Sequence, residues 1–189
     1  MTRKVIVRKG GLSDFEEFYE LFRRSLKDGY FLYSQNVADY VLEKELPKVE
    51  LKKGIKKGEK KLFLAYVDDK LAGYLLTNKQ NGGVAFGHWL GVDKNFRNQN
   101  VGTNLLRFWE KDAFAKGAHK LDLYTTRNDV GFYKKLGFTL AGECPDCWYG
   151  LDHFWFYKTL RKSSEKLFLK EFLKSKKGKK KLGGATLIH

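Results

Sequence analysis

The segment from Leu90 to Leu106 has the composition of an anion-binding connection between a strand and a helix. An apolar stretch ends at Val92, a short polar loop follows, and a helical pattern begins at Val101. Such a loop exposes consecutive backbone N–H groups, and the start of the helix adds positive potential. Gly102 has no side chain, so a phosphate can approach the backbone closely. These residues predict an anion site, with an ordinary strand-to-helix connection as the alternative.

A second segment, from Thr125 to Phe138, contains the run Phe-Tyr-Lys-Lys-Leu-Gly-Phe, which begins at Phe132. Together the two segments resemble the GNAT superfamily of N-acetyltransferases. In that superfamily, a V-x-x-x-x-R-x-x-G-x-G/A loop binds the pyrophosphate of acetyl-coenzyme A (acetyl-CoA), and an N-(x)n-FY-x-K-L-G-F segment follows downstream. The loop is matched by Val92, Arg97 and Gly102.

The resemblance implies a cosubstrate, a reaction and a set of contacts. Acetyl-CoA would donate its acetyl group to a primary amine, which would attack the thioester directly in a ternary complex. The backbone of Leu90, Gly91 and Val92 would pair with the pantetheine arm like an added strand. The other implied cofactor contacts are Arg97, Asn98, Gln99, Asn100, Val101, Gly102 and Thr103 in the loop, and Asn128 further along the chain.

Tyr133 occupies the position that the family uses for the proton donor to the departing thiolate. A phenol suits that role because its reference pKa of about 10 keeps it protonated at neutral pH. The alternative is a core aromatic residue. The sequence departs from the family pattern at two positions. Asn100 replaces the first loop glycine, and Asn128 lies closer to Tyr133 than in many relatives.

A base for the incoming ammonium has several candidates. His88 lies on the strand before the cofactor loop, and strand alternation places it on the same face as Leu90 and Val92. Packing is the alternative role for His88. Asp152 and His153, near the last hairpin, are further candidates.

Cys144 and Cys147 form a single C-x-x-C pair. A structural zinc site needs four ligands, and His119 and His153 would complete one only by an accident of the fold. We therefore expect no metal, and we interpret the cysteines as surface residues of a substrate loop. In the aromatic-rich hairpin that follows, Trp148 and Tyr149 are either packing residues or part of the acceptor pocket.

The hydrophobic patterns predict one mixed α/β domain over residues 1–160, in the order β-α-α-β-β-β-α-β-α-β-β. The resemblance implies a GNAT-like, mostly antiparallel central sheet flanked by helices. The expected strands are residues 5–8, 62–67, 71–76, 84–92, 121–125, 138–140 and 154–159. The expected helices are residues 13–26, with a capping box from Ser13 to Glu16, part of 36–58, which ends in a basic loop over 52–58, then 101–116 and 129–136.

The chain has 189 residues and a net charge of +15, and residues 161–189 contain ten basic and two acidic residues. In this basic C-terminal extension we expect a helix over 163–174 and a flexible Lys/Gly segment from 176 to 184. Such a segment is usually a solvated, flexible tail, and contact with RNA or the ribosome through phosphates is the alternative. The alternative function is therefore a non-catalytic module that binds CoA or RNA.

No run of residues approaches the roughly 18 apolar residues of a membrane span, and the N-terminus lacks the apolar stretch of a secretory signal. We expect a cytoplasmic protein that makes no membrane contact, with a homodimer left open. The sequence does not name the acceptor. An amino acid, a polyamine, an antibiotic, a peptide N-terminus and a protein lysine are all candidates, although the positive body disfavours polycations.

Overall fold

The computed structural model describes residues 4–182, and seven strands in this part of the chain form one sheet in the order β1-β2-β3-β4-β5-β7-β6. The strands are β1 (Val5–Gly10), β2 (Lys60–Val67), β3 (Lys70–Asn78), β4 (Val84–Val92), β5 (Lys120–Thr125), β6 (Thr139–Cys144) and β7 (His153–Thr159). Across these described strands, β4 and β5 pair in parallel and all other neighbours are antiparallel. The predicted mixed, mostly antiparallel fold is confirmed.

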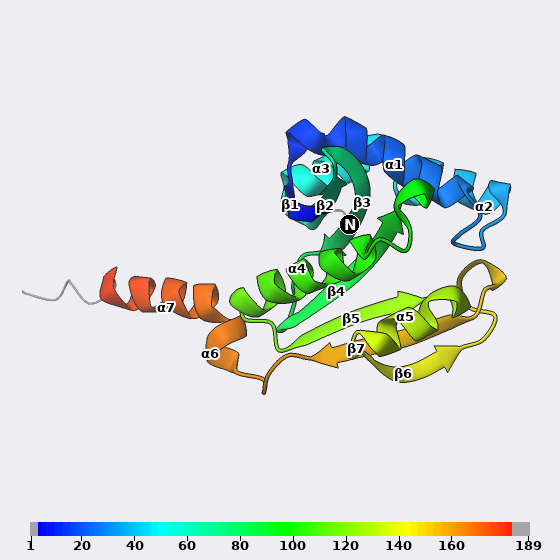
Figure 1. Cartoon of the computed structure of the whole chain (residues 1–189). Coiled ribbons are helices and arrows are strands. Elements are labelled where there is room, and N and C mark those ends of the chain that lie inside the picture. The colour runs from blue at the N-terminus through cyan, green and yellow to red at the C-terminus, as the bar shows by residue number, and fades with distance from the viewer. Residues whose placement is uncertain (1–3, 183–189) are drawn as a thin grey trace, which may run out of the picture.

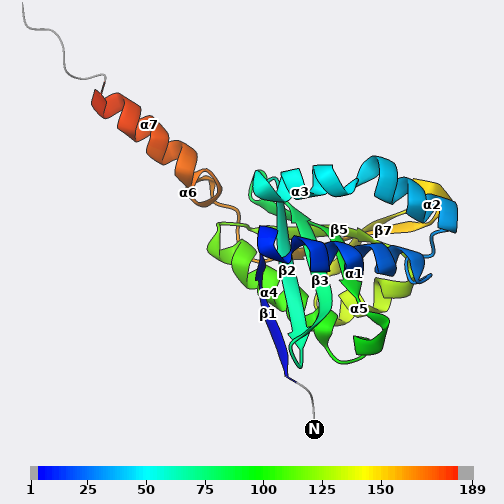
Figure 2. The same ribbon diagram turned by 90° about the horizontal axis from the view of Figure 1, so that it is seen from above.

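Helices cover both faces of the sheet (Figures 1 and 2). The helices of the described residues are α1 (Phe15–Lys27), α2 (Gln35–Tyr40), α3 (Lys48–Lys56), α4 (Val101–Ala115), α5 (Val130–Lys135), α6 (Glu165–Phe168) and α7 (Lys170–Leu182), with a π-helical turn from Val41 to Glu45 after α2. Helices α4 and α5 share one hydrophobic core with the sheet, while α1, α2 and α3 share a second core on the opposite face. We call these the α4 face and the α1 face.

Helix α1 shows how the sequence builds the α1 face. Phe15, Phe18 and Phe22 recur at helical spacing and are fully buried, and the ring of Phe18 lies 5.3 Å from that of Tyr74 on β3. The expected capping box at Ser13 is wrong. A 3-10 turn (Leu12–Asp14) precedes the helix instead, and the Asp14 carboxylate accepts a hydrogen bond of 2.8 Å from the backbone N–H of Gly11.

Two further segments differ from the expectation. The basic stretch expected as a loop over 52–58 mostly belongs to α3, which buries Leu51 and Gly54 and leaves its lysines exposed. In the C-terminal extension, α7 continues to Leu182, although a flexible segment was expected from residue 176. The helix projects away from the body in Figure 2. Residues 183–189, which include the end of the expected flexible segment, lie outside the described residues.

The sheet splits between its two parallel strands. β4 and β5 are paired only over four residues of each, Val84–Gly87 and Lys120–Leu123. Beyond that point β4 stays with β3, β5 stays with β7, and the two strands diverge in Figure 1. The final residues of β4, which include the start of the first motif, therefore have no strand neighbour on their β5 side in the part of the chain that the structure describes.

Candidate active site

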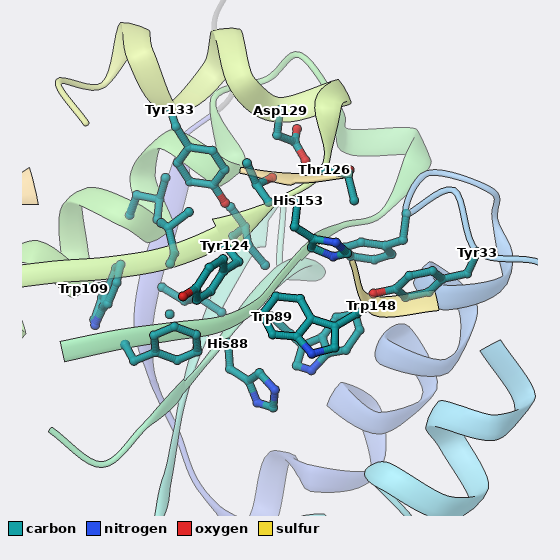
Figure 3. A pocket seen from close by; sticks show the side chains of 18 of the residues that line it. Tyr33, His88, Trp89, Trp109, Tyr124, Thr126, Asp129, Tyr133, Trp148 and His153 are labelled. Carbon is teal, nitrogen blue, oxygen red and sulfur yellow. The ribbon is translucent and has the colours of Figure 1, made fainter. Parts of the chain in front are cut away.

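A cavity of about 440 Å³ lies at the split between β4 and β5 (Figure 3). Its lining includes Leu90, Leu106 and Tyr133, which pack in the core of the α4 face. It also includes Trp89 and Tyr149, which pack in the core of the α1 face. The cavity therefore connects the two faces of the sheet through the split, so two ligands that arrive from opposite faces can meet inside it.

The polar loop predicted to bind a phosphate leads from β4 into α4. Asn98 and Asn100 both have a φ of 61°, a left-handed conformation that asparagine tolerates better than most residues. Asn100 is the N-cap residue of α4, and its backbone oxygen accepts a hydrogen bond of 2.8 Å from the Asn104 side chain. Asn100 thus adopts the conformation that a glycine would readily supply, so its departure from the family pattern does not prevent the turn.

Gly102 lies in the first turn of α4 and faces the end of β4. A Cβ atom there would lie 3.2 Å from the ring of Phe132 and 3.7 Å from the side chain of Val92. The glycine therefore lets the first turn of α4 approach α5 and the end of β4 closely. The backbone N–H groups of the first helical turn have no partner within the helix, so the N-terminus of α4 can receive an anion.

The connection between α1 and α2 crosses from this loop to the start of α5. Asp28 forms an ion pair with Arg97, whose guanidinium also lies 4.4 Å from the centre of the Tyr30 ring. The Tyr30 hydroxyl donates a 2.5 Å hydrogen bond to Asp129, and the Asn128 amide donates one of 3.1 Å to the backbone oxygen of Tyr30. We call residues 28–30 the strap. The strap thus contacts both Arg97 and Asn128, two of the residues predicted to bind the cofactor.

Tyr133 lies on α5 and is buried against Phe132, Phe138 and Phe156, whose ring centres are 5.2, 5.6 and 5.9 Å away. Figure 3 shows its hydroxyl pointing toward the interior of the cavity that it lines. Burial raises the pKa of Tyr133, and the nearby Asp129 carboxylate raises it further. The hydroxyl therefore keeps its proton throughout the neutral pH range.

The predicted face of His88 is wrong because β4 contains a β-bulge. Thr77 on β3 pairs with Gly87 on β4, and Leu76, the residue before Thr77, pairs with Trp89. His88 lies between these two β4 residues and has no partner among the described residues of β3, so it is the extra residue of the bulge. The bulge reverses the alternation beyond it. Leu90 and Val92 pack on the α4 face, whereas His88 stays with Trp89 on the α1 face, 5.8 Å between ring centres.

The environment of His88 keeps its ring uncharged. Burial, followed by the positive charge of Lys60, lowers the pKa of His88 to about 4. The Lys60 ammonium lies 3.2 Å from Nδ1 of His88 and also donates a 2.7 Å hydrogen bond to Asn78. Because an ammonium can only donate, Nδ1 of His88 is the acceptor and Nε2 carries the ring proton.

Several residues that line the cavity were not predicted from the sequence motifs. They are Phe31, Tyr33 and Glu45 from the segment between α1 and α3, Trp89 next to the bulge, and Asp129 before α5. Burial raises the pKa of Asp129. The α1–α3 segment reaches the site only through folding, so motif spacing cannot find it. Trp148 and Tyr149, whose alternative role was to line the acceptor pocket, do line the cavity.

The remaining candidates separate into cavity and surface residues. His153 is buried and lines the cavity, with Nδ1 2.9 Å from the backbone oxygen of Leu151. Asp152 is instead paired with Arg127 at 3.0 Å. Cys144 is exposed and Cys147 half-buried, both as free thiols. Within residues 4–182, no group of three or more metal-ligating side chains comes together, and no helix is long and apolar enough to cross a membrane.

The comparisons with known proteins agree with this fold. Among solved structures, the PaiA N-acetyltransferase from Thermoplasma acidophilum in complex with coenzyme A is similar at a TM-score of 0.69 and 22% identity, over 82% of this chain and 99% of that chain. An acetyltransferase of the GNAT family from Streptococcus pneumoniae gives 0.67 and 22%, over 82% and 99%. Ard1 from Thermoplasma volcanium gives 0.59 and 18%, over 82% and 97%.

At these identities, the similar structures establish the fold alone. A search of curated proteins finds no match. A model of the acetyltransferase (GNAT) family matches residues 15–138, well over half of the chain, and this stretch contains both sequence motifs. The resemblance is thereby confirmed, and the chain belongs to the acetyltransferase (GNAT) family.

Proposed function

We propose that this protein transfers the acetyl group of acetyl-CoA to a primary amine by direct attack in a ternary complex. The observation that carries the proposal is the cavity at the split in the sheet, which is lined both by residues of the α4 face, among them Leu90 and Tyr133, and by aromatic residues of the α1 face. Two substrates can be bound at the same time from opposite sides and meet at the split. Residues 1–160 form the catalytic domain in this proposal, and residues 161–189 form a basic extension.

The residues on the α4 face fit CoA. The N-terminus of α4 and the loop from Arg97 to Thr103 suit a pyrophosphate, which they would hold through backbone N–H groups, and Gly102 adds no side chain to this turn. The end of β4, from Leu90 to Val92, has no strand neighbour among the described residues on its β5 side, although the backbone oxygen of Val92 accepts a hydrogen bond of 3.3 Å from Arg97. The amide-bearing pantetheine arm can add to this edge. The similar T. acidophilum enzyme was solved in complex with coenzyme A.

Acetyl-CoA supplies the activated acetyl thioester. The residues of the chain orient the two substrates and supply a proton. Tyr133 holds a proton at its hydroxyl and presents it to the cavity, where we assign it to the departing sulfur. Asn128 would contact the pantetheine arm after it exchanges its present partner, the backbone oxygen of Tyr30. Both assignments follow the family positions of these residues.

The geometry favours His88 as a hydrogen-bond donor to the acceptor rather than as the base. Its lowered pKa of about 4 makes it a poor proton acceptor from an ammonium, and Lys60 faces its Nδ1 atom. We infer that Nε2–H of His88 positions the acceptor on the α1 face.

A panel of primary amines tests the proposed function. The full chain is incubated with acetyl-CoA and each amine, and free thiol is measured with a chromogenic reagent. We expect thiol release that depends on the amine, together with an N-acetylated product of the expected mass. A protein that binds acetyl-CoA but acetylates no amine in a broad panel would instead favour the alternative of a non-catalytic CoA-binding module.

A further inference from the structure

The α1-face end of the cavity is walled by aromatic rings from three separate parts of the chain. Tyr33 comes from the α1–α2 connection, Trp89 from β4, and Tyr149 from the connection between β6 and β7. The Tyr33 ring lies 6.1 Å from that of Trp89 at 72° and 5.4 Å from that of Tyr149 at 76°. Tyr124 and Trp148 form another perpendicular pair at 5.1 Å. These edge-to-face pairs hold flat apolar walls on several sides of the space.

The charges around the cavity select an amine and disfavour an acid. The carboxylates among its described lining residues are Glu45 and Asp129, and these lining residues include no lysine or arginine. An ammonium is attracted both by the carboxylates and by the faces of the aromatic rings. The Lys60 ammonium lies beside the lining residue His88, but it is already hydrogen-bonded to Nδ1 of His88 and to Asn78. A carboxylate on the same acceptor would therefore enter the cavity with no lysine or arginine among those described lining residues to pair with, which costs free energy.

The size and the closure of this end indicate a small acceptor. The cavity of about 440 Å³ must also admit the acetyl thioester, and ligand pockets span roughly 300–1,000 Å³. At the α1 face, the Tyr149 hydroxyl donates a hydrogen bond to Glu45, and its ring contacts Tyr33. The β6–β7 connection is thus joined to the α1–α3 segment across this end. This contact between the two segments leaves little room for a folded protein to insert a lysine side chain into the cavity.

From these observations we propose that the acceptor is a small monoamine whose primary amino group is attached to a flat aromatic body, the arylalkylamine class. This proposal rests on the proposed function and names its substrate class. The aromatic body lies between the rings, and its amino group points to the split. Polyamines lack a flat body, and the net charge of +15 repels their additional charges.

The test measures binding and turnover separately. The full chain, saturated with CoA, is titrated calorimetrically with four probes: 2-phenylethylamine, n-butylamine, phenylalanine and spermidine. We expect 2-phenylethylamine to bind at least tenfold more tightly than each of the others. Trp148→Ala should weaken its binding about fivefold or more. Phe172→Ala is the matched control, because Phe172 is 52% exposed on α7, much as Trp148 is 50% exposed, and lies outside the cavity. Because Trp148 is exposed, its loss should leave the fold intact.

The outcomes separate the two proposals. Equal or tighter binding of butylamine, phenylalanine or spermidine overturns the substrate class, as does unchanged binding in Trp148→Ala. If one of those three amines is also acetylated efficiently, the transferase function stands and only the class fails. If 2-phenylethylamine binds selectively but no thiol is released from acetyl-CoA, the class stands and the transferase function fails.

Discussion

Replacing Tyr133 with phenylalanine separates a catalytic hydroxyl from a packing ring. The ring is held by Phe132, Phe138 and Phe156, and all three contacts survive in the variant. No described residue hydrogen-bonds to the hydroxyl, so its removal leaves no buried partner unsatisfied. A volume-conserving change of this kind costs less than about 1.5 kcal/mol of unfolding free energy. The melting temperature should therefore fall by a few degrees at most.

The expected effect on the rate is larger. A positioned general acid contributes about 10²- to 10⁴-fold, so kcat should fall at least about 10²-fold, or about 2.7 kcal/mol of transition-state stabilisation. Acetyl-CoA affinity should change little, because the loop from Arg97 to Thr103 is untouched. Burial also raises the pKa of Tyr133, so in the wild-type enzyme ionisation of this residue should not lower the rate between about pH 7 and pH 10.

The assay is steady-state thiol release with the amine identified by the panel, combined with thermal unfolding and calorimetric titration of acetyl-CoA. Tyr157→Phe is the control, since Tyr157 lies on β7 outside the cavity and should retain full kcat. A Tyr133→Phe enzyme with nearly full kcat would remove the hydroxyl from the mechanism and leave protonation to water. A large loss of stability with unchanged kcat would assign the residue to the core.

Four further predictions concern the loop, the strap, His88 and the extension. Gly102→Glu should abolish acetyl-CoA binding in a folded protein, because the new side chain adds bulk and a negative charge where the phosphates bind. Gly142→Glu is the control and should bind normally, since a Cβ atom there meets nothing within 4 Å. Undiminished acetyl-CoA affinity in Gly102→Glu would refute the loop assignment. Tyr30→Phe removes the hydrogen bond to Asp129 and should tighten acetyl-CoA binding severalfold by calorimetry, because the strap then opens at lower cost; unchanged affinity would show that the strap stays closed around the cofactor. His88→Gln should raise the KM for the amine and leave the pH dependence of kcat in place, whereas loss of a titration step would restore His88 as the base. Deletion of residues 176–189 should leave the melting temperature unchanged and weaken any salt-dependent binding of an RNA mixture in a filter assay; a large fall in melting temperature would show that this segment docks on the body.

The sequence predicts those parts of the site that one continuous stretch of residues builds. The loop into α4 is one continuous segment, so its strand, turn and helix start can all be read from consecutive residues. The left-handed conformation of Asn100 was compatible with its residue type, and the structure places it there. The same holds for the fold class, because most strands carry alternating or continuous apolar patterns. By contrast, the basic residues of α3 suggested a loop. The helix buries only Leu51 and Gly54, so its sequence shows little apolar periodicity.

The acceptor end could not be predicted, because tertiary pairing builds it. The bulge at His88 depends on how β4 pairs with β3. Gly87, directly before it, is a residue type that often marks a bulge, but it does not say which residue is the extra one. This single extra residue decides which side chains face which substrate. It turns Leu90 and Val92 to the α4 face, beside the cofactor loop, and leaves His88 and Trp89 on the α1 face with the aromatic walls. Strict alternation would have placed His88 beside the cofactor loop. The assignment of cofactor and acceptor to opposite faces of the sheet therefore follows from the irregularity in β4, next to the point where the sheet divides.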